Sequence, residues 1–283
     1  MRHVDLEDLR LPDTWSAEAR CATLAVLGGA DASDFDEVWR DLKQRLMGLL
    51  HDKCWFCESP VTRSDNAVDH FRPKGRVSDA TQPHTGYRWL TFASANFRFA
   101  CTFCNSRRVD VENGTAGGKA DRFPLLDEDA RVYEVDPAAL DFDDLMATVR
   151  AERPAILDPC HFDDWRLLGC RREDGSPCPT NDDPLTRERV IKSIEIFHLD
   201  YDPTCKQRHT VAGTLLRAVR NAKDAFLVVD PNTLGSELRF QTLALEIKRM
   251  IAKRAPYSGE MRFLLRGQRS ALHPWIQELL EDG

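Results

Sequence analysis

Two cysteine pairs constrain this chain more than any other feature of its sequence. Cys54 and Cys57 form one CxxC pair, Cys101 and Cys104 form another, and residues 58–100 separate them. Four thiolates arranged tetrahedrally make a closed, structural zinc shell, because no coordination position is left for a substrate. Disulfides are the alternative, but paired CxxC spacing in a chain without a secretory signal favours metal. The sequence therefore predicts a structural Zn²⁺ bound by all four cysteines.

An Asp-His dipeptide lies between the cysteine pairs. Hydrolysis of a phosphodiester needs a base for the attacking water, a divalent cation at the scissile phosphate and donors for its oxygens. His70 suits the role of base, although a single histidine on a strand is also compatible with a structural role. Asp69 points to the opposite face of a regular strand, so a bulge or turn is needed to bring the two side chains together.

Two asparagines complete the set of candidate catalytic residues. Asn105 directly follows Cys104, so zinc would fix it at the start of a helix. Its amide oxygen is a usable ligand for a hard cation such as Mg²⁺. We expect Asn96 to orient the imidazole of His70. A turn asparagine and a helix-cap asparagine are the alternatives, and the surrounding cysteine pairs favour the catalytic interpretation.

The pattern CWFC…VDHFRPK…ASANFRFACTFCNSRR…DRFPL resembles the HNH endonuclease superfamily, the ββα-metal nucleases. Within it, the chain is most similar to HNH proteins of bacterial anti-phage systems, such as the Septu-type nuclease subunit and retron-associated HNH proteins. The resemblance implies that His70 is the general base, that Asp69 and Asn105 bind the catalytic divalent cation, and that Asn96 orients His70. The superfamily often has His where this chain has Asn105, which favours Mg²⁺ or Mn²⁺. The resemblance also implies an ABC- or SMC-like ATPase as partner.

The hydrophobic pattern predicts an α+β, mostly helical fold. Residues 66–71 alternate as a strand does, 87–92 fit a second strand or the start of a short helix, and 102–110 are expected to be helical. Together they predict a small ββα-metal HNH module. We expect three parts: an N-terminal helical segment at 1–53, the nuclease module at 54–126, and a mainly helical region at 127–283.

Helices are predicted on both sides of the module. One begins at Thr14 and ends before Gly28, and an amphipathic helix follows over 33–50. A short buried strand is expected over 154–159. Apolar positions at helical spacing predict further helices around 190–199, 211–229, 234–251, 258–266 and 273–281.

Charge is distributed unevenly along the chain. Lys and Arg number 39 against 46 Asp and Glu, a formal net charge of −7, which argues against a protein that coats nucleic acid indiscriminately. Residues 54–124 carry ten basic and seven acidic side chains and are more basic than the parts on either side. This fits a local phosphate-binding site, in which Arg107 and Arg108 are the best candidates. The other basic candidates are Arg72, Lys74, Lys119 and Arg122.

Other features carry weaker signals. The glycine-rich loop at 114–119 lacks the GxxxxGK[ST] spacing, so we do not predict a nucleotide loop. The acidic run at 127–145 fits a solvated face, or else an interface to a basic partner. Cys160, Cys170 and Cys178 fit a second metal site or ordinary buried cysteines. No apolar run is long enough to span a bilayer, and we expect a cytoplasmic location.

The sequence thus predicts a metal-dependent endonuclease that cuts DNA, and the resemblance implies that it acts as the effector of bacterial anti-phage defence. An RNA- or tRNA-cleaving nuclease is one alternative, since no aromatic platform decides between the nucleic acids. A non-catalytic zinc module that binds nucleic acid or a protein partner is another. Such a module would not need Asp69, His70 and Asn105.

Overall fold

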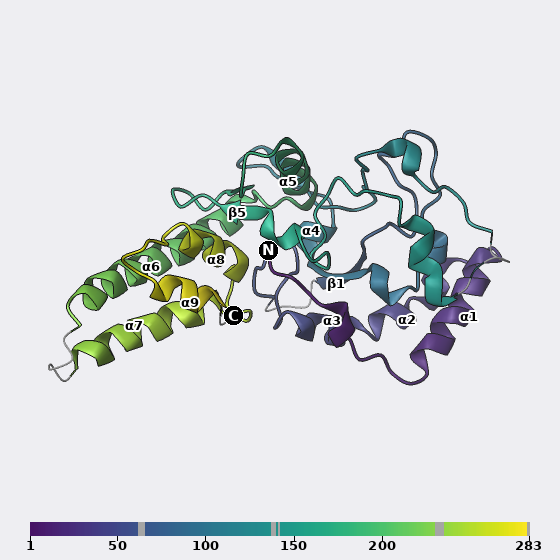
Figure 1. The fold of residues 1–283 in the computed structure, drawn as a ribbon. Helices are drawn as coiled ribbons and strands as arrows, with labels where there is room; N and C mark the ends of the chain where they lie inside the picture. The colour runs from purple at the N-terminus through teal and green to yellow at the C-terminus, as the bar shows by residue number, and fades with distance from the viewer. Residues whose placement is uncertain (62–65, 137–139, 141, 230–234, 282–283) are drawn as a thin grey trace.

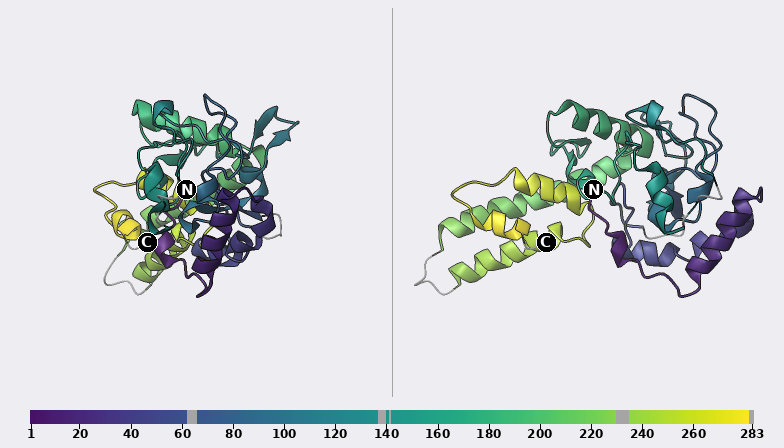
Figure 2. Two further views of the ribbon diagram at one scale, coloured as in Figure 1. Left: turned by 90° about the vertical axis from the view of Figure 1, so that its right-hand side faces the viewer. Right: turned by 45° about the vertical axis from the view of Figure 1, so that its right-hand side comes forward.

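The computed structural model describes residues 1–61, 66–136, 140, 142–229 and 235–281 (Figures 1 and 2). The fold is α+β and 47% helical, with small antiparallel sheets. In the described ranges no helix is both long and apolar enough to cross a membrane.

The α-helices of the described residues are α1 (Trp15–Leu27), α2 (Glu37–Arg40), α3 (Lys43–Leu49), α4 (Thr102–Asn105), α5 (Pro184–Phe197), α6 (Asp202–Leu227), α7 (Ser236–Ile251), α8 (Ser258–Arg266) and α9 (Trp275–Glu281). The strands pair as antiparallel hairpins, β1 (Asn66–His70) with β2 (Phe97–Cys101), β3 (Arg108–Asp110) with β4 (Thr115–Gly117), and β5 (Leu168–Cys170) with β6 (Pro177–Pro179).

The N-terminal helices cover one face of the first hairpin. Helix α1 begins after Thr14 and ends at Gly28, as predicted. The single helix expected over 33–50 is wrong: the segment breaks into a 3₁₀ turn (Ala32–Phe35), α2 and α3. Asp36 and Asp41 flank α2, and aspartate is among the poorer helix formers.

The β1–β2 hairpin is the centre of the molecule. Its register is unbroken from Asn66 opposite Cys101 to His70 opposite Phe97. The second strand is therefore Phe97–Cys101, and the 87–92 segment, expected to form a strand or the start of a short helix, contains a short 3₁₀ helix (Arg88–Leu90). Phe97 and Phe99 pack on the N-terminal helices, because alternate strand residues face the same side.

Helix α4 is a single turn, so the helix expected over 102–110 is wrong beyond Asn105. The carbonyls of Cys104 and Asn105, which a longer helix would use, accept instead from the N–H groups of Lys119 (2.8 Å) and Ala120 (2.7 Å). Gly118 adopts a φ of +99°, and a Cβ there would lie 1.9 Å from the Ser106 carbonyl oxygen. Asn105 consequently lies at the end of a helix, and the chain continues into β3.

The short strand expected over 154–159 is also wrong. Only an isolated bridge joins Pro154 to Leu125, although Ala155, Ile156 and Leu157 are buried as expected. No described strand lies beside this segment to complete a ladder. The Leu157 N–H donates instead to the Ser193 hydroxyl of α5 at 2.8 Å.

The C-terminal helices form an arm that extends to the left in Figure 1, with α6 and α7 packed side by side. Their positions confirm the helices predicted from residue 190 onward, and α5 spans the first of these. The arm has its own apolar core, which includes Leu215, Val219, Ile247, Met261 and Trp275. These residues recur at helical spacing, which is why the sequence pattern located the helices.

A buried carboxylate joins the arm to the first cysteine pair. Glu58 directly follows Cys57 and accepts from the Lys53 ammonium (3.0 Å), the Ser258 hydroxyl (2.8 Å) and the Gly259 N–H (2.9 Å). Lys53 and Glu58 are both almost completely buried. The start of α8 is therefore anchored to the turn that carries the first two cysteines.

We predict that Glu58→Ala lowers the free energy of unfolding by about 3–5 kcal/mol, because it leaves the Lys53 charge buried without its partner. Urea denaturation followed by circular dichroism measures the change. The control is Glu195→Ala, which removes an exposed partner of Arg122 and should cost less than about 1 kcal/mol. Equal effects of the two substitutions would contradict the role given to Glu58.

Candidate metal centre and adjoining pocket

The four predicted cysteines come together. Their sulfur atoms all lie within 4.8 Å of one another, and those of Cys57 and Cys101 are 3.8 Å apart. A tetrahedral Zn²⁺ with bonds of about 2.3 Å separates its sulfur ligands by about 3.8 Å, whereas a disulfide needs about 2.05 Å. All four thiols are free of disulfides. The cluster can hold a metal such as zinc.

Local structure fixes each sulfur in place. Cys54 and Cys57 lie on a tight turn that Glu58 closes with a φ of +55°. Cys101 ends β2 and Cys104 lies in α4. Hydrogen bonds from the Cys101, Cys104 and Cys54 thiols lower the pKa of Cys57 well below that of a free cysteine, because they stabilise its thiolate. Burial raises the pKa of Cys54, and the hydrogen bond with Cys101 raises the pKa of Cys104. Thiolate is the form that binds metal.

Among the described residues, no second cysteine site forms. Cys160, Cys170 and Cys178 belong to no group of three close metal-ligand atoms in the described part of the chain. Burial raises the pKa of Cys170 to about 12, so it remains a neutral thiol at neutral pH. Cys170 is a small buried residue, as the sequence also allowed, whereas Cys160 and Cys178 are only partly buried.

A pocket of about 450 Å³ adjoins the cysteine cluster, because Asn105 follows Cys104. It brings together residues that the sequence singled out from two separate segments. Asp69 and His70 come from the end of β1, and Asn105 from the end of α4. The basic residues at its border are Lys74, Arg76 and Arg107.

His70 is held in the form that a base requires. Its Nε2 lies 2.8 Å from the Thr91 carbonyl oxygen, which can only accept, so Nε2 carries the proton and Nδ1 the lone pair. Trp39 and Phe97 pack edge-on to the ring at 5.1 and 5.3 Å between centroids. Burial, together with the nearby Lys74 charge, lowers the pKa of His70 to about 3. The imidazole is therefore neutral at physiological pH.

Only one oxygen of the Asp69 carboxylate has a hydrogen-bond partner among the described residues. Its Oδ1 accepts from the Lys119 ammonium at 2.9 Å, whereas its buried Oδ2 has no hydrogen-bond partner among the described residues. The bulge or turn expected between Asp69 and His70 is absent from the described strand, because the β1–β2 register is unbroken at both residues. Both residues border the same pocket. A buried oxygen left unpaired is costly unless a ligand meets it.

Asn96 does not perform the role expected of it. Its Oδ1 accepts from the Arg72 N–H at 2.8 Å, and its Nδ2 donates to the carbonyls of Arg72 (3.0 Å) and Leu90 (3.3 Å). Both amide hydrogens of Asn96 are thus bonded to backbone carbonyls. The prediction that Asn96 orients the His70 imidazole by direct contact is therefore wrong. Asn96 instead fixes the turn that follows His70.

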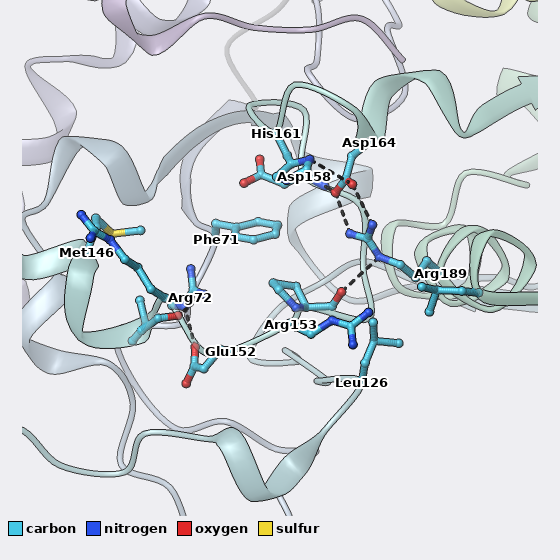
Figure 3. A pocket seen from close by; sticks show the side chains of 14 residues that line it. Phe71, Arg72, Leu126, Met146, Glu152, Arg153, Asp158, His161, Asp164 and Arg189 are labelled. Atoms are coloured by element: carbon cyan, nitrogen blue, oxygen red, sulfur yellow. Dashed lines mark hydrogen bonds and ion pairs between the residues drawn. The ribbon is translucent and has the colours of Figure 1, made fainter.

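Arg72 contradicts the expectation that it grips a phosphate. It is 7% exposed, and its Nε donates to Glu152 at 2.7 Å. It lines a different pocket, of about 520 Å³ (Figure 3). The acidic groups there are neutralised in pairs, as when Arg189 contacts both oxygens of Asp164 at 2.7 and 2.6 Å. The pocket beside the cysteines is the better candidate because Asp69, one of the residues that line it, has a carboxylate oxygen without a partner among the described residues.

Of the basic candidates other than Arg72 and Lys119, two line the pocket and two lie outside it. Lys74 and Arg107 border the site, as expected of phosphate contacts. Arg108 lies outside it, with its guanidinium 5.2 Å from the Phe103 ring centroid. Arg122 pairs with Glu195 on the surface.

From the sequence, Lys119 was expected in a different role, and Arg76 was missed. Lys119 was a candidate for phosphate contact, yet it is 1% exposed and bonds Asp69 and the His70 carbonyl. The two glycines before Lys119 were the sequence feature that could have indicated a close backbone approach at this position. Arg76 also borders the pocket, where it pairs with Asp121, and nothing in its sequence surroundings distinguished it.

Comparison with known proteins adds no assignment. The chain matches no family model, no curated protein and no solved structure. The function is therefore inferred from the residues and geometry of the site itself.

We predict that the purified chain contains one zinc per molecule and that Cys104→Ser removes most of it, since three thiolates leave the shell open. Mass spectrometry of the metal content measures this. Cys178→Ser, outside the cluster, is the matched control and should retain the metal. Full zinc occupancy in Cys104→Ser would rule out the four-cysteine shell.

Proposed function

We propose that this chain is a metal-dependent endonuclease of the HNH type that hydrolyses phosphodiester bonds in DNA. One observation carries the proposal: Asp69, whose buried Oδ2 has no hydrogen-bond partner among the described residues, lines the same pocket as Asn105 and the neutral His70. The order β1, β2, α4 around a four-cysteine cluster supports a ββα-metal arrangement.

The residues present fit a hard divalent cation. The Asp69 carboxylate and the Asn105 amide both offer oxygen, which Mg²⁺ and Mn²⁺ prefer. The buried Asp69 Oδ2 lacks a partner in the described chain, as a ligand atom would before its ion is added. When bound, such a cation polarises the scissile phosphate and stabilises the leaving oxygen.

His70 acts as the general base in this proposal. The proton on Nε2 remains bonded to the Thr91 carbonyl, which orients the ring and leaves Nδ1 to accept a proton from water. A conjugate acid with a pKa of about 3 makes a weak base in the free protein. A negatively charged phosphate entering the pocket raises that pKa, because it favours the imidazolium.

The proposal also explains the basic border of the pocket. Lys74 and Arg107 supply donors for the phosphate oxygens and carry no sequence information themselves. A non-catalytic zinc module would have no use for a buried carboxylate with one unpaired oxygen next to a neutral histidine. No feature of the pocket favours RNA over DNA.

A second basic segment supports an extended nucleic-acid contact. Residues 203–256 carry ten Lys and Arg against four Asp and Glu, which makes them more basic than 54–124. Helix α6 has 26 residues and lies almost entirely within this segment. At 1.5 Å per residue it is about 39 Å long, which matches the length of about eleven base pairs of duplex. Exposed cations lie on one stripe of α6, at Lys206, Arg217 and Arg220.

The arm begins beside the cysteine cluster. Tyr201, which precedes α6, stacks on Phe103 of α4 with 4.6 Å between ring centroids. Arg108 lies over the same Phe103 ring. We propose that duplex DNA contacts the arm and the pocket together, and that DNA is the substrate for this reason.

The biological setting is part of the proposal. The sequence resemblance implies an effector of bacterial anti-phage defence that works with an ABC- or SMC-like ATPase. The acidic total charge supports delivery of DNA by such a partner, since an acidic protein gains little from long-range attraction to DNA.

We predict that the wild-type chain nicks or cuts plasmid DNA with Mn²⁺ and the partner protein, and that His70→Ala slows cleavage by about 10²–10⁴-fold, as expected for loss of a general base. Gel electrophoresis of plasmid over time measures the rate. His161→Ala, which changes a half-exposed histidine away from the pocket, should cleave normally. Equal cleavage by His70→Ala would refute the proposed base, and cleavage of RNA alone would refute the DNA substrate.

We predict that Arg217→Glu with Arg220→Glu weakens binding to duplex DNA and lowers the slope of log affinity against log salt by about 2, roughly one unit per lost phosphate contact. Fluorescence anisotropy in the His70→Ala background measures binding without cleavage. Arg166→Glu with Arg187→Glu, at two other exposed arginines, is the charge-matched control. If both pairs change the slope equally, the arm has no special role.

A further inference from the structure

Lys119 occupies an unusual place for a lysine. Its ammonium is buried and donates to Asp69 Oδ1 at 2.9 Å and to the His70 carbonyl at 2.7 Å. Lysine is almost never fully buried without a partner. Here the partner is the carboxylate proposed to bind the catalytic cation, so the lysine acts on the metal site through Asp69.

The backbone around Lys119 is built to hold this position. Lys119 N–H donates to the Cys104 carbonyl and Ala120 N–H to the Asn105 carbonyl, so the loop is fastened to α4. Gly118 (φ +99°) and Ala120 (φ +48°) both lie in the left-handed region. Glycine is needed at 118, where a side chain would collide with the Ser106 carbonyl. The lysine is thus fixed relative to the cysteine cluster.

The ion pair limits what Asp69 can offer to a metal. With Oδ1 held by the ammonium, only the unpaired Oδ2 is free to face a ligand. Ca²⁺ takes six to eight oxygen ligands and frequently binds a carboxylate through both oxygens, whereas Mg²⁺ takes six at shorter distances and binds through one. A carboxylate restricted to one oxygen favours the smaller ion.

We propose that Lys119 is a positioning residue that sets the metal specificity of the site, by restricting Asp69 to single-oxygen ligation and so selecting Mn²⁺ or Mg²⁺ over Ca²⁺. The inference rests on the proposed catalytic cation at Asp69 and Asn105. It goes further by assigning a role to the glycine-rich loop.

The test measures relative affinity for two ions. Mn²⁺ binding is followed by the loss of its free electron-paramagnetic-resonance signal, and Ca²⁺ is added as competitor. In Lys119→Met the freed Oδ1 permits two-oxygen ligation, so the preference for Mn²⁺ over Ca²⁺ falls by about tenfold or more, the size of effect that ligand-orienting partners have. Lys119→Arg, which keeps a donor to Asp69, retains the wild-type preference.

The ratio of Mn²⁺ affinity to Ca²⁺ affinity distinguishes an effect of the Lys119 charge from an effect on how Asp69 binds the ion. Both ions carry the same charge, so repulsion by the Lys119 ammonium changes both affinities alike and cancels. Lys74→Met is the matched control, because it removes a cation from the same pocket without touching Asp69 Oδ1. It should alter both affinities and leave their ratio unchanged.

The outcomes distinguish this inference from the proposed function. If Mn²⁺ fails to bind the wild-type protein at this site, the proposed catalytic cation and the inference are both overturned. If Mn²⁺ binds and Lys119→Met keeps the wild-type ratio, the inference alone is overturned.

A second variant serves if Lys119→Met does not fold. Asp69→Asn combined with Asn105→Asp keeps the ligand types and the total charge of the pocket. The Lys119 ammonium can only donate, so it bonds the amide oxygen of the new side chain at position 69. The NH₂ group, which cannot bind a cation, then faces the metal site, and Mn²⁺ affinity falls by about 100-fold or more. Binding within about tenfold of wild type would show that Lys119 does not fix this side chain.

Discussion

The packing of four cysteine sulfurs into one cluster is the constraint on which the rest of the structure depends. It joins the turn at Cys54–Cys57 to the end of β2 and to α4. Each neighbour of the cluster then positions something else. Glu58 anchors the C-terminal arm, and the carbonyls of α4 hold the loop that carries Lys119. A metal in this cluster would therefore fix the pocket without taking part in its chemistry.

Local spacing explains what the sequence could predict. The cysteine pairs, the strand that contains Asp69-His70 and the C-terminal helices each depend on residues close together in the chain. The meeting of His70, Asp69 and Asn105 at one pocket follows from the same spacing, because the cysteines bring their two segments together.

The unpredicted features all depend on distant contacts. Arg72 is buried because Glu152, 80 residues away, pairs with it. Helix α4 stops after one turn because the returning loop at Lys119 takes its carbonyls. The basic arm was hidden for a simpler reason: its charge was summed with that of the acidic segments around it. Pattern alone cannot assign such partners, since they are set by tertiary packing.

The central claim is that a cysteine-bound zinc supports a separate, exchangeable cation at Asp69 and Asn105. Anomalous X-ray diffraction from crystals soaked in Mn²⁺, recorded at the zinc and manganese absorption edges, tests it most directly. We expect a zinc peak among the four sulfurs and a manganese peak between Asp69 Oδ2 and the Asn105 amide oxygen. A zinc peak with no manganese at Asp69 would contradict it.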